Sequence, residues 1–126
     1  MRYLSLLLGI VVLLEGCAAA AAGGGRSRNV ITQEDLATTQ AITAYDAIRD
    51  LHPQWLKARG QTTGASSLTP LLPTVFLDGT RMGSIDLLGV YQVNNIEEIR
   101  YLDAAQAGIR YGMGYPRGII EIISLR

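Results

Sequence analysis

The sequence predicts an α+β fold, in which a small mixed β-sheet carries short helices. Three observations indicate this class. Segments that start with helix-capping residues alternate with strand-like segments between residues 29 and 126. The run TVFL followed by Asp78-Gly79 is typical of a β-hairpin, because its turn requires a positive φ that glycine adopts at little cost. The last apolar run, IIEIISL, is hydrophobic on both faces except at Glu121 and therefore fits the middle of a covered sheet.

Capping signals predict the first two helices. The stretch NVITQEDL predicts a short strand and then a helix that begins after Thr32, with Asp35 three residues further on to complete a capping box. Thr43 and Asp46 repeat this spacing before a second helix, which Pro53 ends. The apolar stripe of this second helix consists of Ala44, Ala47, Ile48 and Leu51.

Two further segments have the pattern of strands. IEEIRYL alternates, which places Ile99 and Tyr101 on one face and Glu98 and Arg100 on the other. QWLKAR is interpreted as a short strand that carries Trp55. Between these strands, glycine and proline mark residues 60–73 as a loop.

Helical signals return in the second half of the chain. Ser84 is expected to cap a brief helix that ends at Leu88. Asp103 is expected to cap a longer one, with Gln106 completing a capping box. Gly112 then fits the glycine that ends this helix in a left-handed conformation.

The N-terminus predicts export and lipid anchoring. Arg2 precedes an apolar run from Leu4 to Leu14, which is too short to span a bilayer but fits the core of a signal peptide. The run ends in LEGC, which resembles a bacterial lipobox, so cleavage is expected between Gly16 and Cys17 and acylation on Cys17. An ordinary signal peptide, cleaved after one of the following alanines, is the alternative.

These signals divide the chain into three parts. Residues 1–16 are a lipoprotein signal peptide, residues 17–28 a lipid-anchored tether rich in alanine and glycine, and residues 29–126 a single folded domain. The lipobox resemblance also implies a location: because Ala18 replaces the aspartate that signals inner-membrane retention, we expect a periplasm-facing anchor in the bacterial outer membrane.

Several stretches together resemble the plug domain of TonB-dependent receptors. PTVFLDG resembles an apolar plug strand, and NNIEEIRYLDAAQAGIRYGMGYPRGIIEIIS resembles the Ile-Glu-x-Ile strand, short helix, Tyr-Gly pair and glycine-led strand of that domain. The resemblance implies a TonB-receptor plug-like fold for residues 29–126. The residues that carry it are Asp78, Gly79, Ile96, Glu97, Ile99, Tyr111, Gly112 and Gly118.

The sequence also departs from these receptors. Asp103-Ala104 stands where receptors commonly have an arginine-glycine pair, and no TonB box is evident between Cys17 and Asn29. The chain ends at Arg126, whereas receptors continue into a barrel of about 22 strands. We therefore expect a plug-like domain that forms no pore of its own.

The composition argues against an enzyme and against a nucleic-acid-binding protein. Eleven basic residues balance eleven acidic ones, so no net positive field attracts nucleic acid. Cys17 and His52 are the only cysteine and the only histidine, which leaves no thiolate–imidazole pair, no serine triad and no soft metal cluster. We predict no catalytic residue, no cofactor and no metal. His52 is expected to cap a helix end or face water, and Glu97 to turn inward toward loop backbone amides.

The tyrosines near the C-terminus can be interpreted in two ways, and so can the glycines. Tyr101, Tyr111 and Tyr115 form either an aromatic ligand surface or, as we favour, part of the core with hydroxyls at its rim. The stretch YGMGYPRG has the glycines of a phosphate loop, but it follows a helix instead of preceding one, which favours simple turns.

The function expected from the sequence is binding. The leading hypothesis is an outer-membrane lipoprotein whose periplasmic domain binds or assembles with another protein. One alternative is an accessory that docks to, or gates, a separately encoded outer-membrane barrel. The other is a carrier of a small ligand such as an iron chelate or a glycan. The surfaces expected to make contacts are the loop Gly60–Pro73 and the hairpin exit Thr80–Ser84.

Overall fold

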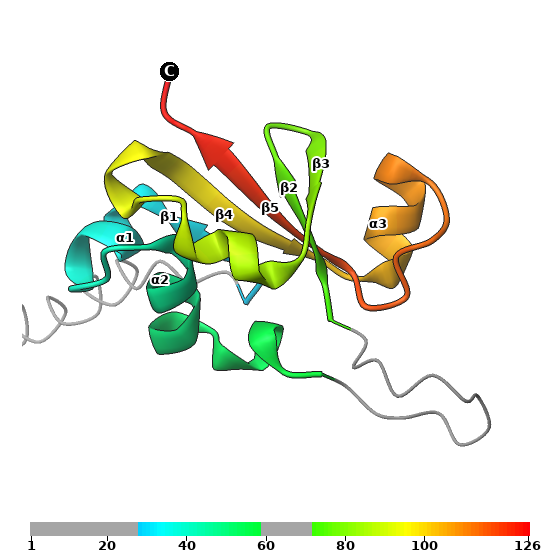
Figure 1. The fold of residues 1–126 in the computed structure, drawn as a ribbon, viewed down its shortest axis with the longest axis horizontal. Helices are drawn as coiled ribbons and strands as arrows, with labels where there is room; N and C mark the ends of the chain where they lie inside the picture. Colours follow the sequence, from blue (N-terminus) through cyan, green and yellow to red (C-terminus); the bar gives the residue numbers. More distant parts are fainter. Residues whose placement is uncertain (1–27, 59–71) are drawn as a thin grey trace, which may run out of the picture.

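The computed structural model describes residues 28–58 and 72–126, which form an α+β fold around a five-stranded mixed sheet (Figure 1). The strand order is β1-β4-β5-β2-β3. Only β2 and β5 pair in parallel, and the other three pairs are antiparallel. This arrangement confirms the predicted class. The strands are β1 (Val30–Thr32), β2 (Thr74–Leu77), β3 (Thr80–Gly83), β4 (Ile96–Leu102) and β5 (Ile119–Ser124).

Short helices connect and cover these strands. The α-helices are α1 (Gln33–Thr38), α2 (Ala44–Leu51) and α3 (Ala104–Tyr111). Three 3₁₀-helices, η1 (Pro53–Leu56), η2 (Ile85–Gly89) and η3 (Val93–Asn95), complete the set in the described residues.

The predicted caps are confirmed. Thr32 and Asp35 form a reciprocal capping box at the start of α1, and Asp103 forms another with Gln106 at the start of α3. The Thr43 hydroxyl accepts a hydrogen bond from the Asp46 amide at the start of α2. These bonds satisfy amide groups that would otherwise lack partners in the first helical turn. Short local spacings in the sequence were therefore sufficient to place the start of each of the three α-helices.

Strand β5 lies in the middle of the sheet, as its two-sided hydrophobicity predicted. Ile120 and Ile122 point into the larger core, which also contains buried side chains of α1, α2, η1 and η2. On the opposite face, Ile119 packs against Phe76 of β2 and Ala107 of α3. Both faces of β5 are thus covered by packed side chains.

Strand directions give the sheet two distinct ends. Because β1, β2 and β5 run in the same direction, their first residues lie together at one end, which we call the junction end. The hairpin turn at Asp78-Gly79 and the last residue of β5, Ser124, lie at the other, which we call the distal end. The Asp78 carboxylate accepts hydrogen bonds from the amide and hydroxyl of Ser124, at 3.0 and 2.6 Å, and so ties the turn to β5.

One predicted strand is wrong. Trp55 belongs to the 3₁₀-helix η1 and not to a strand. Pro53 occupies the first position of this helix, where its fixed φ is suitable and its missing N–H is not needed. The apolar pair Trp55 and Leu56 packs against the larger core from one helical turn.

Candidate functional site

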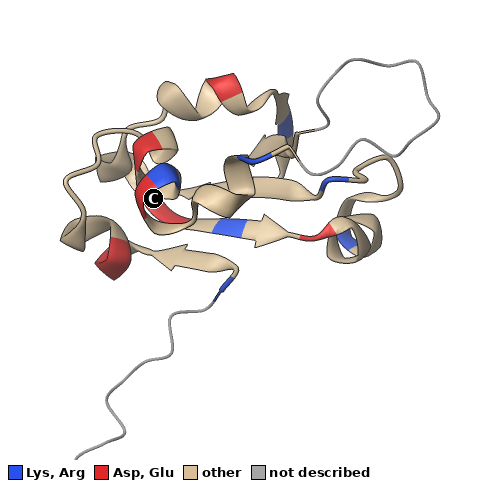
Figure 2. Ribbon diagram, turned by 90° about the horizontal axis from the view of Figure 1, so that it is seen from below, with Lys and Arg blue, Asp and Glu red and all other residues tan. Residues whose placement is uncertain are grey.

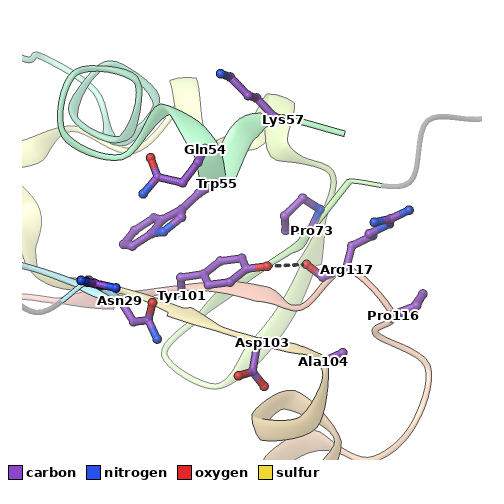
Figure 3. Close-up of a pocket in the computed structure, with 11 residues that line it drawn as sticks. Asn29, Gln54, Trp55, Lys57, Pro73, Tyr101, Asp103, Ala104, Pro116 and Arg117 are labelled. Atoms are coloured by element: carbon purple, nitrogen blue, oxygen red, sulfur yellow. Dashed lines mark hydrogen bonds between the residues drawn. The ribbon is translucent and has the colours of Figure 1, made fainter. Parts of the chain in front are cut away.

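A hollow of about 460 Å³ opens at the junction end of the sheet (Figure 3). We call it the junction hollow and define it by Arg28, Trp55, Lys57, Tyr101 and Arg117. These residues come from the start of the described chain, from η1 and its following residue, from β4 and from the turn before β5. The volume is within the range of small-ligand sites.

Stacked rings form one wall of the junction hollow. The Trp55 indole lies almost parallel to the His52 ring, with centroids 4.4 Å apart, and its centroid is 5.6 Å from that of Tyr101. The Tyr101 hydroxyl donates to the Arg117 carbonyl oxygen at 3.0 Å (Figure 3). His52 ends α2 as its C-cap residue, as expected, with its backbone amide donating to the Ile48 carbonyl oxygen at 2.7 Å, and its ring stacks on the indole. The wall is therefore aromatic.

Basic residues dominate the charge around this hollow. Arg28, Lys57 and Arg117 contribute three cations to its lining, against the single carboxylate of Asp103. That carboxylate already serves as the N-cap of α3, where it accepts a hydrogen bond from the backbone amide of Gln106 at 2.8 Å. The local balance is positive although the whole chain is neutral. Elsewhere in the described ranges, basic and acidic residues are interspersed along the ribbon (Figure 2).

A second hollow, of about 380 Å³, opens at the distal end. We call it the distal hollow. Its apolar lining comes from Leu77, Val90, Tyr91, Ile96 and Ile122. Its polar lining comes from Gln92, Asn95 and Ser124. An apolar pocket with a polar rim is the usual setting of an anchor side chain in a protein–protein interface.

Exposed apolar residues lie in or next to the segments that line the distal hollow. Val90 is 72% exposed, although it lines the hollow, and Leu125 is 41% exposed. The Leu125 amide donates to the Asn95 carbonyl oxygen at 2.9 Å, which holds Leu125 beside the rim. Ile42, also 72% exposed, lies in a segment that pairs with residues 91–93, since its carbonyl oxygen accepts from the Val93 amide. Apolar side chains gathered in this way are characteristic of interaction surfaces.

A buried carboxylate lies on the face of the sheet that α3 covers. Glu121, in the centre of β5, is 1% exposed. Its Oε1 atom accepts a hydrogen bond from the Tyr111 hydroxyl and lies 3.3 Å from Nη2 of Arg110, whereas its Oε2 atom has no hydrogen-bond partner. Burial, followed by the hydrogen bond to Glu121, raises the pKa of the Tyr111 hydroxyl above its ordinary value. The sequence singled out Glu121 as polar but gave no partner for it.

The structure brings some of the predicted motif residues together. Gly79 in the hairpin turn lies close to the Tyr111 hydroxyl, which in turn contacts Glu121. Gly112 ends α3 as expected and has a positive φ of 86°, but its ψ of −179° differs from the left-handed helical conformation that was predicted. Gly118 precedes β5 with a φ of 77°, close to the carbonyl oxygen of Leu102.

Other motif residues serve the core. Ile99 is buried in the larger core, as the alternation of β4 predicted, and Ile96 lies in the same core although strict alternation would place it on the other face. Glu97 was expected to turn inward, but it is exposed. The register of β4 shifts between Ile96 and Glu98, so Glu97 is the extra residue of a β-bulge.

The three tyrosines do not form one ligand surface. Tyr101 packs against the larger core, whereas Tyr111 and Tyr115 pack against Phe76 on the other face of the sheet. Packing of all three rings against the core is confirmed, but the Tyr111 hydroxyl contacts the buried Glu121 instead of lying at the rim. The glycines of YGMGYPRG follow α3 and adopt positive φ angles, which confirms their interpretation as turns.

Some of the predicted positions lie outside the described ranges. Gly16, Cys17 and almost all of the loop Gly60–Pro73 are among them. The second expected contact surface, Thr80–Ser84, forms the edge strand β3, whose side chains are largely exposed. This strand is short, contains Arg81 and pairs through an irregular register with β2. Such features hinder the addition of another strand.

Within residues 28–58 and 72–126, no group of three histidine, cysteine or acidic side chains is placed to hold a metal ion. No helix of these ranges combines the length and the hydrophobicity needed to cross a bilayer. No protein-family model matches the chain, and no curated protein or solved structure matches it either.

Sequence patterns alone missed both hollows. Arg28, Lys57 and Arg117 are far apart in the chain and have no periodic relationship. Leu77, Val90 and Leu125 are equally dispersed. Only the sheet topology brings each set to one end.

Proposed function

We propose that this protein is a non-enzymatic lipoprotein of the bacterial outer membrane whose periplasmic domain binds another protein. Acyl chains on Cys17 hold it in the membrane, and the TonB-receptor plug-like domain of residues 29–126 presents the distal hollow to the partner. The lipobox-like sequence LEGC supports the anchor.

The observation that carries this proposal is the position of the apolar surface. Val90 lines the distal hollow and Leu125 is bonded to its lining residue Asn95, whereas Arg28 lines the hollow at the other end. A domain held by its N-terminus presents the opposite end to proteins in solution. An apolar anchor side chain that entered the distal hollow would lose contact with water where the hollow and the partner cover it, and such buried anchors contribute most to interface energies.

A separately encoded outer-membrane barrel is a second candidate for the partner. The order of hairpin, β4, α3 and β5 agrees with the motifs that resemble a receptor plug. This agreement favours an accessory role in which the domain docks to, or gates, a separately encoded outer-membrane barrel. Co-purification with a barrel protein, or altered substrate uptake in a deletion strain, would distinguish this role from binding to a periplasmic protein.

The anchor is tested by Cys17→Ser. We expect this variant to lose incorporation of labelled fatty acid and to leave the membrane fraction, because the thiol that carries the acyl chains is gone. Detergent extraction of the wild-type protein is the matched control for membrane association. A wild-type protein that is unlabelled and soluble would refute the anchor.

The binding surface is tested by charge substitution. Val90→Asp places a carboxylate at the distal hollow, and Met113→Asp places the same charge on a residue that is 99% exposed elsewhere. We expect Val90→Asp to reduce recovery of the specific partner by at least tenfold, since an unpaired charge would have to be buried, while Met113→Asp retains it. Equal recovery with both variants would contradict the proposed surface.

A further inference from the structure

We propose that the junction hollow docks onto an anionic lipid surface, so that the domain lies with its junction end against the membrane. The ligand chemistry is the headgroup phosphate of anionic phospholipids. The inference rests on the acyl anchor at Cys17 proposed above, and it gives the domain an orientation that the anchor alone does not provide.

The path of the chain supports this orientation. Arg28 is both a lining residue of the junction hollow and the position at which the described chain begins. It lies eleven positions after Cys17. Eleven residues reach at most about 40 Å when fully extended, and about 20 Å as a random coil. The junction hollow is therefore the part of the domain that stays closest to the headgroups.

Charge complementarity supports the same occupant. Arg28, Lys57 and Arg117 surround the hollow, and the Asp103 carboxylate that faces it is engaged in capping α3. The lining therefore carries a net positive charge, which complements the negative charge of a headgroup phosphate. Basic residues next to an anionic bilayer favour association by about fivefold each.

The orientation also agrees with the proposed binding surface. The distal hollow lies at the opposite end of the sheet, so it points away from the membrane when the junction hollow contacts the headgroups. A protein partner then has unobstructed access to Val90 and Leu125. Docking of one end and recognition at the other are compatible in a single molecule.

Trp55 provides an intrinsic probe, because it is the only tryptophan of the chain and lies in the wall of the junction hollow. The full-length acylated protein is reconstituted into phosphatidylcholine vesicles with or without phosphatidylglycerol, each containing the same amount of phosphatidylcholine with a nitroxide on its headgroup. We expect stronger quenching of Trp55 in the anionic vesicles. High salt should remove the difference, because it screens the charges.

Matched substitutions identify the residues responsible. Lys57→Gln and Arg117→Gln should each lower the docking constant about fivefold. Arg81→Gln removes an exposed charge from β3, outside the lining of the hollow, and should have no effect. Equal quenching in both vesicle types, with the protein still floating with the vesicles, would overturn the lipid contact and leave the anchor intact.

Two other outcomes would also overturn the inference. A protein that fails to float with either vesicle would refute the anchor and, with it, the proposed orientation. A change in Trp55 emission on addition of inorganic phosphate or glycerol phosphate without vesicles, lost in Lys57→Gln and Arg117→Gln, would show that the hollow binds a soluble anion instead.

Discussion

Tyr111, the last residue of α3, donates its hydroxyl to the carboxylate of Glu121 in the centre of β5. The pair lies on the side of the sheet that α3 covers, and the Tyr111 ring contacts Phe76 with centroids 4.4 Å apart. A buried carboxylate is costly unless polar groups surround it. The hydroxyl therefore stabilises Glu121 and, at the same time, fixes the end of α3 on the sheet.

Removal of this hydroxyl should destabilise the fold. Tyr111→Phe retains the ring but removes the hydrogen bond to the buried Glu121 carboxylate, which keeps the half-exposed Arg110 at 3.3 Å, so we expect a loss of about 2 kcal/mol in the free energy of unfolding. Glu121→Gln retains an acceptor for Tyr111 and removes the buried charge, so its loss should stay within about 1 kcal/mol. Urea denaturation of both variants and of the double variant measures the coupling. If the losses of the two single variants simply added up in the double variant, the proposed coupling between Tyr111 and Glu121 would be contradicted.

The same hydroxyl predicts a pH dependence at the alkaline end. The pKa of Tyr111 is raised above 10.0 in the folded protein, mainly by burial and then by the hydrogen bond to Glu121. Because the folded state holds its proton more tightly, this contribution to stability is complete below pH 10 and is lost as the pH rises through the folded pKa. Tyr111→Phe should reduce the slope of stability against pH in this range. An unchanged slope would show that the hydroxyl titrates normally.

At low pH, we expect the stability of the fold to depend on pH with the opposite sign, because of Asp78. Hydrogen bonds from the Ser124 side chain and then from its amide lower the pKa of Asp78 below 3.8. The contribution is present above the unfolded value of 3.8 and is lost as the pH falls through the lower folded value. Asp78→Asn keeps a residue that tolerates the positive φ of the turn. Its stability should therefore vary less than that of the wild type between pH 4 and pH 2, measured by chemical denaturation.

Two glycines should respond in opposite directions to alanine. A Cβ atom at Gly118 would lie 2.2 Å from the Leu102 carbonyl oxygen, in a residue whose φ is already +77°, so Gly118→Ala should cost at least about 3 kcal/mol. Gly108 lies inside α3, where an added Cβ atom would meet nothing within 4 Å. Gly108→Ala should stabilise the protein by about 1 kcal/mol. Thermal unfolding of the two variants checks both signs.

Local chemistry explains which elements could be predicted. Thr32, Thr43 and Asp103 each have a partner three residues along the chain, so their helix starts depend on short-range bonds. The hairpin turn depends on the Asp78-Gly79 pair, and the central position of β5 depends on its hydrophobicity on both faces. In all these cases the deciding contact or pattern lies within a few residues.

Interactions between residues far apart in the chain explain why other features were predicted wrongly or missed. The stretch QWLKAR predicts a short strand that carries Trp55, but packing against the core favours a 3₁₀-helix that begins at Pro53. Glu97 faces solvent because the pairing of β4 with β5 contains a bulge, which no local pattern predicts. The two hollows combine residues from separate elements, so only the folded chain defines them.

Site-specific photocrosslinking in intact cells tests the central claim most directly. A photoreactive amino acid replaces Val90 at the distal hollow, and in a control replaces Ile109, which is 90% exposed on α3. The account predicts a discrete protein adduct from position 90 that is absent from position 109, and that disappears when the acyl anchor is removed by Cys17→Ser. The same adduct from both positions, or none from position 90 in the anchored protein, would contradict it.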